Sequence, residues 1–452
     1  MGTIIIFGFF LWCLLALLFL LLAPPLLILF FPLEQLIQSS SSFFRDTAFG
    51  LQATNYIVAF TVALTTGYAV FKSPQRFQGI LNSTTIIIGI MFIWTLLSCL
   101  WSPGRVKGFE VFVSTVPYLA MFFIFMPLLI TSLTDWSRVA RLCLVLGTII
   151  SGLILISPEF TVKFGRLGLD MASEAKGGRS SPLALGELGG TCIVLAVFVG
   201  TKFDRLYFKA FRGFAVLLGT ILVVQSGSRG QLMFAVITVA LSYPISRQFS
   251  NAKNYIFAMM GLAFILILIY YIAGQVANTG SLDTEKRWAE GATSQGVDVR
   301  LGNIIFLLET WLKSPAFWIQ GLGFYSFGEL NPFGEPYTHA IVVDMLGELG
   351  LIGFTLFSTM CLLSWISCRK IFIAVRNDPI QRANFSSLAA MLIYQFLLSN
   401  KQGNIAGSFL MFSLILLAAR IEKSPDFYSD IITVESNDSL EQISDIRTAT
   451  AS

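Results

Sequence analysis

The sequence predicts an all-α, polytopic membrane bundle of about twelve transmembrane helices. Of its 452 residues, 55% are apolar and only 12% are charged, and the mean hydropathy is +0.75. Both values lie far outside the usual range of soluble globular proteins. A crossing needs about 20 mostly apolar residues, and the apolar runs use up most of the chain. This composition excludes a large soluble catalytic domain.

The apolar runs follow one another with mostly short polar connections. They cover residues 3–22, 50–71, 82–101, 108–131, 137–157, 181–201, 208–225, 230–246, 254–274, 340–367, 383–399 and 403–419. No Lys or Arg precedes the first run, so we expect a retained anchor interrupted by Pro24 and Pro25 rather than a cleaved signal peptide. Within the long connection 275–338, apolar residues from Ile304 to Leu312 recur at helical spacing and end before Ser314 and Pro315. This pattern predicts an amphipathic helix lying against the membrane surface.

The distribution of basic residues indicates the orientation, because an even number of crossings brings both ends of the chain to one side. The side of the termini carries Lys72, Arg76, Arg138, Arg141, Lys202, Arg205, Lys209, Arg212, Arg247, Lys253, Arg369, Lys370, Arg376, Arg382, Arg420 and Lys423. The positive-inside rule assigns this side to the cytoplasm, so both termini are expected there. Residues 421–452 are polar and rich in acids, which predicts a disordered cytoplasmic tail.

The opposite face carries more basic residues than topology alone requires. They are Arg45, Arg105, Lys107, Lys163, Arg166, Lys176, Arg179, Arg229, Lys286, Arg287, Arg300, Lys313 and Lys401. Three places hold most of the arginines: the loop 157–180 with Arg166 and Arg179, the small-residue turn before Arg229, and the long connection with Arg300. Any one could be an ordinary loop charge, but several guanidinium groups on one face suit a phosphate or diphosphate.

His339 is the single histidine, and it lies where the long connection meets the tenth run. Imidazole is well matched to accepting a proton near neutral pH. A lone histidine at this place could also simply anchor a helix end. Neither His339 nor the six scattered cysteines, which form no CxxC pair, can complete a metal site. We therefore expect no metal and no cofactor.

Three acidic residues lie inside apolar runs, where they are costly unless paired or facing water. They are Glu187 in the sixth run, and Asp344 and Glu348 in the tenth. Asp344 and Glu348 share a helix face because they are four residues apart. A relay from an acid to His339 would require His339 to precede the helix. Alternatively, the acids neutralise arginines and hold helices in register, which we favour for Glu348.

In their order along the chain, these residues resemble the O-antigen ligase and polysaccharide polymerase (Wzy-like) family of bacterial membrane glycosyltransferases. The resemblance covers roughly Ser181 to Gly353. It rests on the turn Ser226-Gly-Ser-Arg-Gly230, Arg300 ahead of the helix with Trp311, Gly321-Leu-Gly-Phe324, and His339 leading into Gly347-Glu-Leu-Gly-Leu-Ile-Gly353.

The resemblance implies transfer of a glycan from undecaprenyl diphosphate, without a metal, at the periplasmic face of the inner membrane. Residues 1–420 would form the transferase domain, with 275–338 as its large periplasmic loop. By the resemblance, Arg229 and Arg300 would hold the diphosphate, and His339 would activate the acceptor hydroxyl. From its place next to the membrane entry at Ser181 and Pro182, Arg179 is chosen over Arg166 as a third contact. The buried acids Asp344 and Glu348 are expected to support the site. The expected partners are the polyprenyl-linked donor, a lipid-anchored or glycan acceptor, and membrane lipids, but no nucleic acid.

Two alternatives stay open at this point. The motifs are shared by ligases and by repeat-unit polymerases, so the sequence does not separate these two activities. A transporter or flippase for an anionic lipid or solute would use the same arginines and intramembrane acids, but it usually has charges along a path to both faces. Here the unusual charges gather on one face, which favours chemistry there.

Overall fold

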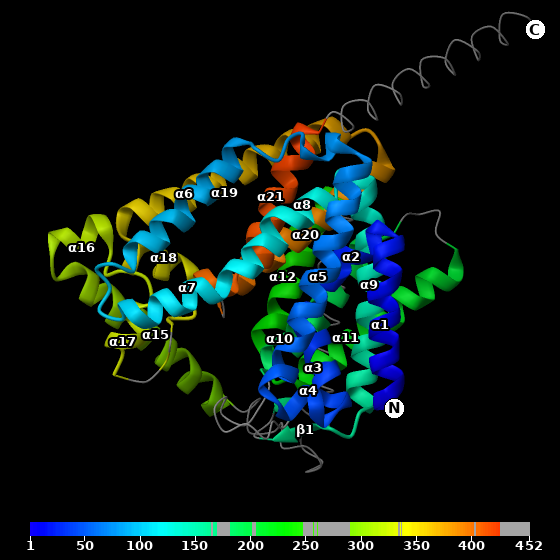
Figure 1. Cartoon of the computed structure of the whole chain (residues 1–452), viewed down its shortest axis with the longest axis horizontal. Helices are drawn as coiled ribbons and strands as arrows, with labels where there is room; N and C mark the ends of the chain where they lie inside the picture. Colours follow the sequence, from blue (N-terminus) through cyan, green and yellow to red (C-terminus); the bar gives the residue numbers. More distant parts are fainter. Residues whose placement is uncertain are drawn as a thin grey trace, which may run out of the picture.

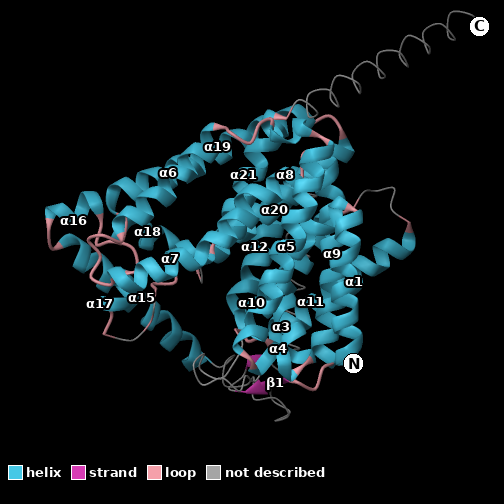
Figure 2. Ribbon diagram, viewed as in Figure 1, coloured by secondary structure: helices cyan, strands magenta, loops and turns pink. Residues whose placement is uncertain are grey.

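In the part of the chain that the structure describes, the protein consists of helices and one small hairpin of strands (Figure 2). The computed structural model describes residues 1–163, 166–169, 181–200, 205–246, 290–332, 335, 337–401 and 404–424, with single helical residues at 256 and 260. The two strands pair antiparallel, with Phe160 opposite Leu169. The all-α prediction is therefore confirmed for the described part of the chain.

Helices occupy every predicted apolar run that the structure describes, whereas the run 254–274 lies outside the described residues. The elements are α1 (Gly2–Leu18), η1 (Leu20–Leu22), α2 (Ala23–Ile28), α3 (Phe30–Ser40), α4 (Ser42–Asp46), α5 (Ala48–Lys72), η2 (Pro74–Phe77), α6 (Ser83–Ser98), α7 (Arg105–Leu119), the π-helical segment η3 (Ala120–Phe125), α8 (Met126–Leu129), α9 (Leu133–Ile156), β1 (Phe160–Lys163), β2 (Arg166–Leu169), α10 (Pro182–Phe198), α11 (Leu206–Gln225), α12 (Arg229–Ser246), α15 (Glu290–Leu312), α16 (Pro315–Gln320), α17 (Ser326–Leu330), α18 (Ile341–Gly347), α19 (Gly350–Val375), α20 (Pro379–Ser399), η5 (Ile405–Gly407) and α21 (Phe409–Lys423).

Five of the described helical stretches are long and apolar enough to cross a membrane. They are Gln52–Lys72, Arg105–Leu129, Leu133–Ile156, Leu206–Gln225 and Gly350–Val375. A sixth crossing results if Leu20–Ile28 and Phe30–Ser40, bent by 83°, count as one. These helices support a multi-pass membrane protein, while the number twelve stays a prediction.

The first apolar run is broken where the prolines predicted an interruption. Helix α1 ends at Leu18, and Phe19 has an extended backbone. Pro24 and Pro25 then lie in the first turn of α2, where proline's missing N–H costs no hydrogen bond. The chain turns back through α2 and α3 before α5 begins.

This return places the two described ends of the chain at opposite ends of the bundle (Figure 1). A side chain at Gly2 would meet the main chain of Ser40, at the end of α3. The Thr65 hydroxyl donates to Ala16 O, so α1 runs alongside α5 in the same direction. Lys423 lies beside Gly79, past the far end of α5. One crossing was expected before α5, whereas the structure has α1 followed by the bent pair Leu20–Ile28 and Phe30–Ser40 there. The side of the membrane on which each terminus lies stays a prediction.

The long connection contains the expected helix. Helix α15 ends at Leu312, directly before Ser314 and Pro315. Its apolar side packs on α18, since Leu307 is 1% exposed and a side chain at Gly347 would meet it 2.5 Å away. Leu307, Leu322 and Phe327 form a small core there. Residues 275–289, which begin this connection, lie outside the described residues.

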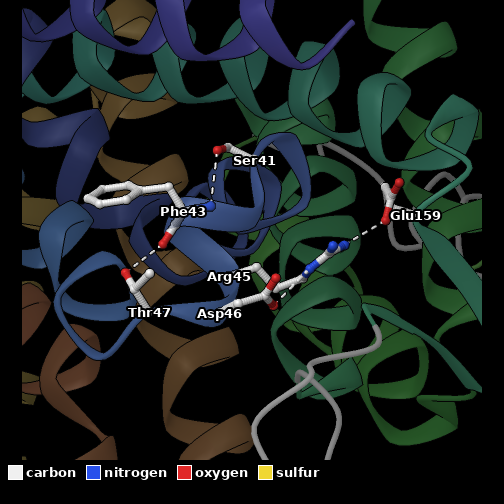
Figure 3. Close-up of polar contacts among 6 residues, drawn as sticks. All are labelled: Ser41, Phe43, Arg45, Asp46, Thr47 and Glu159. Carbon is white, nitrogen blue, oxygen red and sulfur yellow. Dashed lines mark hydrogen bonds and ion pairs between the residues drawn. The ribbon is translucent and has the colours of Figure 1, made fainter.

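The corner between α3 and α5 is fastened to the segment before the hairpin (Figure 3). Arg45 Nη1 lies 2.7 Å from Glu159 Oε2, and its Nε lies 3.2 Å from Asp46 Oδ1. Ser41 and Thr47 cap α4 and α5, because their hydroxyls accept from Phe43 N and Gly50 N. The outward-facing Arg45 is thus part of an ion pair that joins two connections.

The last described helix, α21, continues to Lys423, and Ile421 is fully buried. The tail that the sequence predicts to be disordered lies, from residue 425 on, outside the described residues.

Close packing of α10 on α11 gives a first test of the fold. A Cβ at Gly219 would lie 2.6 Å from the carbonyl oxygen of Gly189, whereas at Gly213 on the same helix it would meet nothing within 4 Å. We expect Gly219→Ala to lower the free energy of unfolding by about 1–3 kcal/mol. Gly213→Ala should leave it unchanged or raise it, because alanine favours helix. Thermal midpoints of the two variants in detergent check this, and equal midpoints would contradict the packing.

Candidate functional site

Basic side chains from separate parts of the chain gather around Lys401. Lys401 follows α20, and Arg300 on α15, Arg166 at the start of β2 and Arg229 at the start of α12 are all close enough to act on it electrostatically. Burial and then these three positive charges lower the pKa of Lys401 to about 8. Like charges repel at short range, so bringing these four basic side chains together costs free energy.

The turn between α11 and α12 is shaped to admit Lys401. Gly227 has φ 65°, a left-handed conformation that residues with side chains rarely adopt. At Gly230 a Cβ would overlap the end of the Lys401 side chain and lie 2.6 Å from its Cδ. The small residues that separate the two apolar runs therefore allow the ammonium group to lie against the backbone beside Arg229.

His339 lies in the loop before α18, which begins at Ile341. Its side chain is 18% exposed, and Nε2 lies 3.6 Å from Glu335 Oε2. The ring of Tyr337 packs edge to face on it, with centroids 4.5 Å apart. Nδ1 is buried and has no hydrogen-bond partner among the described residues.

His339 also has an unusual backbone, with φ 68°. A residue with a side chain in this left-handed region costs on the order of 1–3 kcal/mol, and such outliers cluster at functional sites. Among residues other than glycine, Tyr325 at φ 65° is the second with positive φ in the described chain.

The surroundings keep His339 neutral at physiological pH. Burial and the charge of Arg300 lower the pKa of His339, and Lys401 acts in the same direction. Glu335 raises the pKa of His339, but less than burial and Arg300 lower it. A neutral imidazole can accept a proton, which is what a general base requires.

The carboxylate of Asp344 is hydrogen-bonded to the loop that precedes His339 and not to the imidazole of His339. Its Oδ1 accepts from the Thr338 hydroxyl at 2.5 Å, and Thr338 Oγ1 accepts from Ala340 N at 3.2 Å. Asp344 is 1% exposed and Thr338 is fully buried. The acid that lies against His339 is Glu335. The relay predicted from Asp344 to His339 is therefore not supported by a direct contact between these two residues.

Glu348 joins the two glycine-containing motifs of the family resemblance. Its carboxylate accepts from Phe327 N at 3.0 Å, and its carbonyl accepts from Gly323 N at 2.8 Å. Gly321 and Gly350 both have positive φ, and a side chain at either would meet the other segment's backbone. Glu348 thus binds backbone N–H groups and fixes the start of α19.

The residues predicted from the sequence fall into three groups. Arg229, Arg300 and His339 lie around Lys401, whereas Arg179 lies outside the described residues and Arg166 is the residue of its loop found near Lys401. Glu187 is elsewhere, accepting from Gln395 Nε2 at 2.8 Å. Within the described chain, no three His, Cys, Asp or Glu side chains group as metal ligands.

Three side chains of this site had no predicted role: Lys401, Glu335 and Tyr337. Lys401 was counted among the outward basic residues, and its position in a connection of the same face as Arg229 was the available signal. Glu335 and Tyr337 lie within four residues of His339, but the loop conformation decides that they contact it.

No protein-family model matches the chain, and the comparison with curated proteins finds no match.

The Thr338 contact makes a testable element of the site. Thr338→Val removes the hydroxyl that donates to buried Asp344 and accepts from Ala340 N. Leaving such buried groups unsatisfied costs about 1–3 kcal/mol, so we expect a lower thermal midpoint in detergent. Thr338→Ser keeps the hydroxyl and should stay close to the original midpoint. If Val and Ser variants unfolded at the same temperature, the hydrogen bonds would not hold this loop.

Proposed function

We propose that the protein transfers a glycan from undecaprenyl diphosphate to an acceptor hydroxyl at the periplasmic face of the bacterial inner membrane. The observation that carries this proposal is a neutral histidine beside Arg300 and Lys401, with Arg229 and Arg166 within electrostatic reach of Lys401. The ordered motifs of the O-antigen ligase and Wzy-like family support the same reading.

The basic cluster suits a diphosphate leaving group. Guanidinium groups bind phosphate oxygens through paired, charge-assisted hydrogen bonds, and an ammonium adds a compact charge. Bringing an anion into the cluster relieves the repulsion that lowers the pKa of Lys401. Because Arg300 and Lys401 also face His339, the leaving group would lie next to the base. The proposed reaction needs no metal ion for charge neutralisation.

The proposed step is a single inverting displacement. The acceptor oxygen attacks the anomeric carbon while the bond from that carbon to the diphosphate oxygen breaks. His339 accepts the proton of the acceptor hydroxyl, and the released polyprenyl diphosphate keeps the bonding electron pair. Arg229, Arg300 and Lys401 stabilise the negative charge that develops on it. Buried Asp344 and Glu348 position the loop and the helix start around His339.

The orientation follows from the basic residues at the other end. Arg76, Arg420 and Lys423 lie there together, and the positive-inside rule favours that end as cytoplasmic. The cluster around Lys401 would then face the periplasm, as would Gly2. A lipid-anchored acceptor would make the enzyme a ligase, and a growing glycan would make it a polymerase.

Replacing the base tests the reaction. In a deletion strain, His339→Ala and Arg300→Gln should reduce attached surface glycan by about a hundredfold or more. Arg105→Gln, an equal charge change at an exposed site, should complement fully. The variants must be present in the membrane at equal amounts, measured by immunoblot.

The carrier-linked intermediate distinguishes the two activities. Long chains accumulating on undecaprenyl diphosphate indicate a ligase, and single repeat units indicate a polymerase. Normal surface glycan with His339→Ala would refute the proposed chemistry and favour a transporter.

The pH dependence of transfer by purified protein gives an independent test. His339 must be neutral to accept a proton, and its pKa is lowered below the ordinary value of about 6.5. Activity should therefore persist as pH falls to about 6.5 and decline only below it. Lys401 must be charged to bind diphosphate, so activity should also decline as pH rises through about 8.

Two variants test which residue causes each decline in activity, the one at low pH (the acidic limb) and the one at high pH (the basic limb). Glu335→Gln removes the carboxylate that raises the pKa of His339, which moves the acidic limb to lower pH. Lys401→Arg keeps a charge at high pH and should remove the basic limb. An acidic limb that stays fixed in Glu335→Gln would exclude His339 as the titrating base.

A further inference from the structure

A second basic pocket lies at the opposite end of the bundle from the cluster around Lys401. It has a volume of about 220 Å³, and its lining is mostly polar. The lining residues come from the η2 segment, the chain before α9, and the end of α21: Ser73, Gln75, Arg76, Gln78, Thr131, Arg420 and Ser424. None of these lining residues is acidic. At about 30 Å³ per water molecule in the liquid, the pocket has room for a phosphate group.

The two arginines of this pocket are held in place by main-chain carbonyls. Arg420 is 2% exposed, and it donates to Ile130 O at 2.7 Å and Arg76 O at 2.6 Å. Arg76 Nη1 donates to Leu128 O at 3.0 Å and Leu129 O at 3.1 Å. These bonds satisfy the carbonyls at the end of α8 and fix both guanidinium groups. Both positive charges are therefore already in place at the pocket. Binding an anion there costs little side-chain conformational entropy.

Among the described residues, the nearby acids are engaged with other groups. Asp135 Oδ2 accepts from the Thr131 hydroxyl at 3.0 Å, and Arg138 lies 4.0 Å from Asp135 Oδ1. Glu422 pairs with Lys370 at 3.0 Å and Lys423 at 3.4 Å. The hydroxyls, amides and guanidinium groups of the lining are the groups that bind phosphate oxygens in proteins.

The segment that carries Arg76 also carries exposed apolar side chains. Phe71 is 86% exposed, Phe77 is 56% exposed and Leu81 is 85% exposed. Large apolar side chains beside a polar pocket are typical of the membrane interface, where the polar part meets lipid headgroups. Basic pockets between transmembrane helices on the cytoplasmic side bind anionic headgroups.

From these observations we infer that the pocket of Arg76 and Arg420 is a phosphate-binding site, and that it takes the headgroup of an anionic phospholipid. The site is separate from the glycan-transfer reaction. It is separated from Gly2 and the hairpin by roughly the length of α5, which is about 37 Å for its 25 residues.

Lipid titration of the purified full chain in detergent tests this site. The ligands are dioctanoyl phosphatidylglycerol, dioctanoyl phosphatidylcholine and inorganic phosphate, and the readouts are the thermal midpoint and lipid retention in native mass spectrometry. We expect phosphatidylglycerol to bind more tightly than phosphatidylcholine, which has the same phosphodiester but no net charge. Arg76→Gln should weaken binding of phosphatidylglycerol about tenfold.

Two further variants keep the test decisive. Arg76→Gln also removes bonds to α8, so Gln78→Glu adds a negative charge at an exposed lining residue and should weaken binding about threefold or more. Arg141→Gln makes the same charge change at an exposed residue of α9 outside the lining and should alter binding less than twofold. Inorganic phosphate binding with the same sensitivity to the variants would identify free phosphate as the source of the ligand. If no ligand's affinity responded to Arg76→Gln or Gln78→Glu, or if Arg141→Gln weakened binding equally, the inference would be wrong.

Discussion

Repulsion among like charges around Lys401 is the constraint on which the candidate site depends. Arg300, Arg229 and Arg166 all act on this lysine. A folded chain maintains such a grouping only when other interactions hold each charge in place. Glu335 offsets part of the charge at Arg300.

The interactions that hold this arrangement are largely backbone contacts made by buried acids and by glycines. Glu348 accepts from Phe327 N, and Asp344 acts through Thr338 on Ala340 N. Intramembrane acids are often assigned to proton relays because ionised groups are expensive in apolar surroundings. Here the hydrogen bonds of both acids go to the chain around the site rather than to His339. The loop is fixed on both sides of His339, by Thr338 before it and by α18 after it, and His339 has a left-handed backbone between them. Nδ1 of His339 has no hydrogen-bond partner among the described residues.

The sequence predicted the helices well and their connection less well. Apolar runs correspond to helices because each must bury its backbone hydrogen bonds in an apolar medium. Helix α3 was missed because it is buried yet polar: Gln35, Gln38 and Ser39 are all under 10% exposed. Its cost is met by tertiary bonds such as Gln35 Nε2 to Ser181 O at 3.0 Å, which hydropathy cannot detect. Helix α3 brings Ser40, shortly before the start of α5, back beside Gly2.

The arginines at the two ends of the bundle have different contacts. A count of basic residues predicts the face on which each arginine lies, but it does not predict what the arginine does there. At one end Arg76 and Arg420 donate to the carbonyls that close α8. At the other end Arg229 and Arg300 act on a lysine and, for Arg300, on a histidine. A sequence count assigns both sets to a face, but only the packing of chain segments far apart in sequence decides whether a guanidinium meets carbonyls or cations. Lys401 illustrates the limit: its effect depends on Gly230, more than 150 residues away, having no side chain.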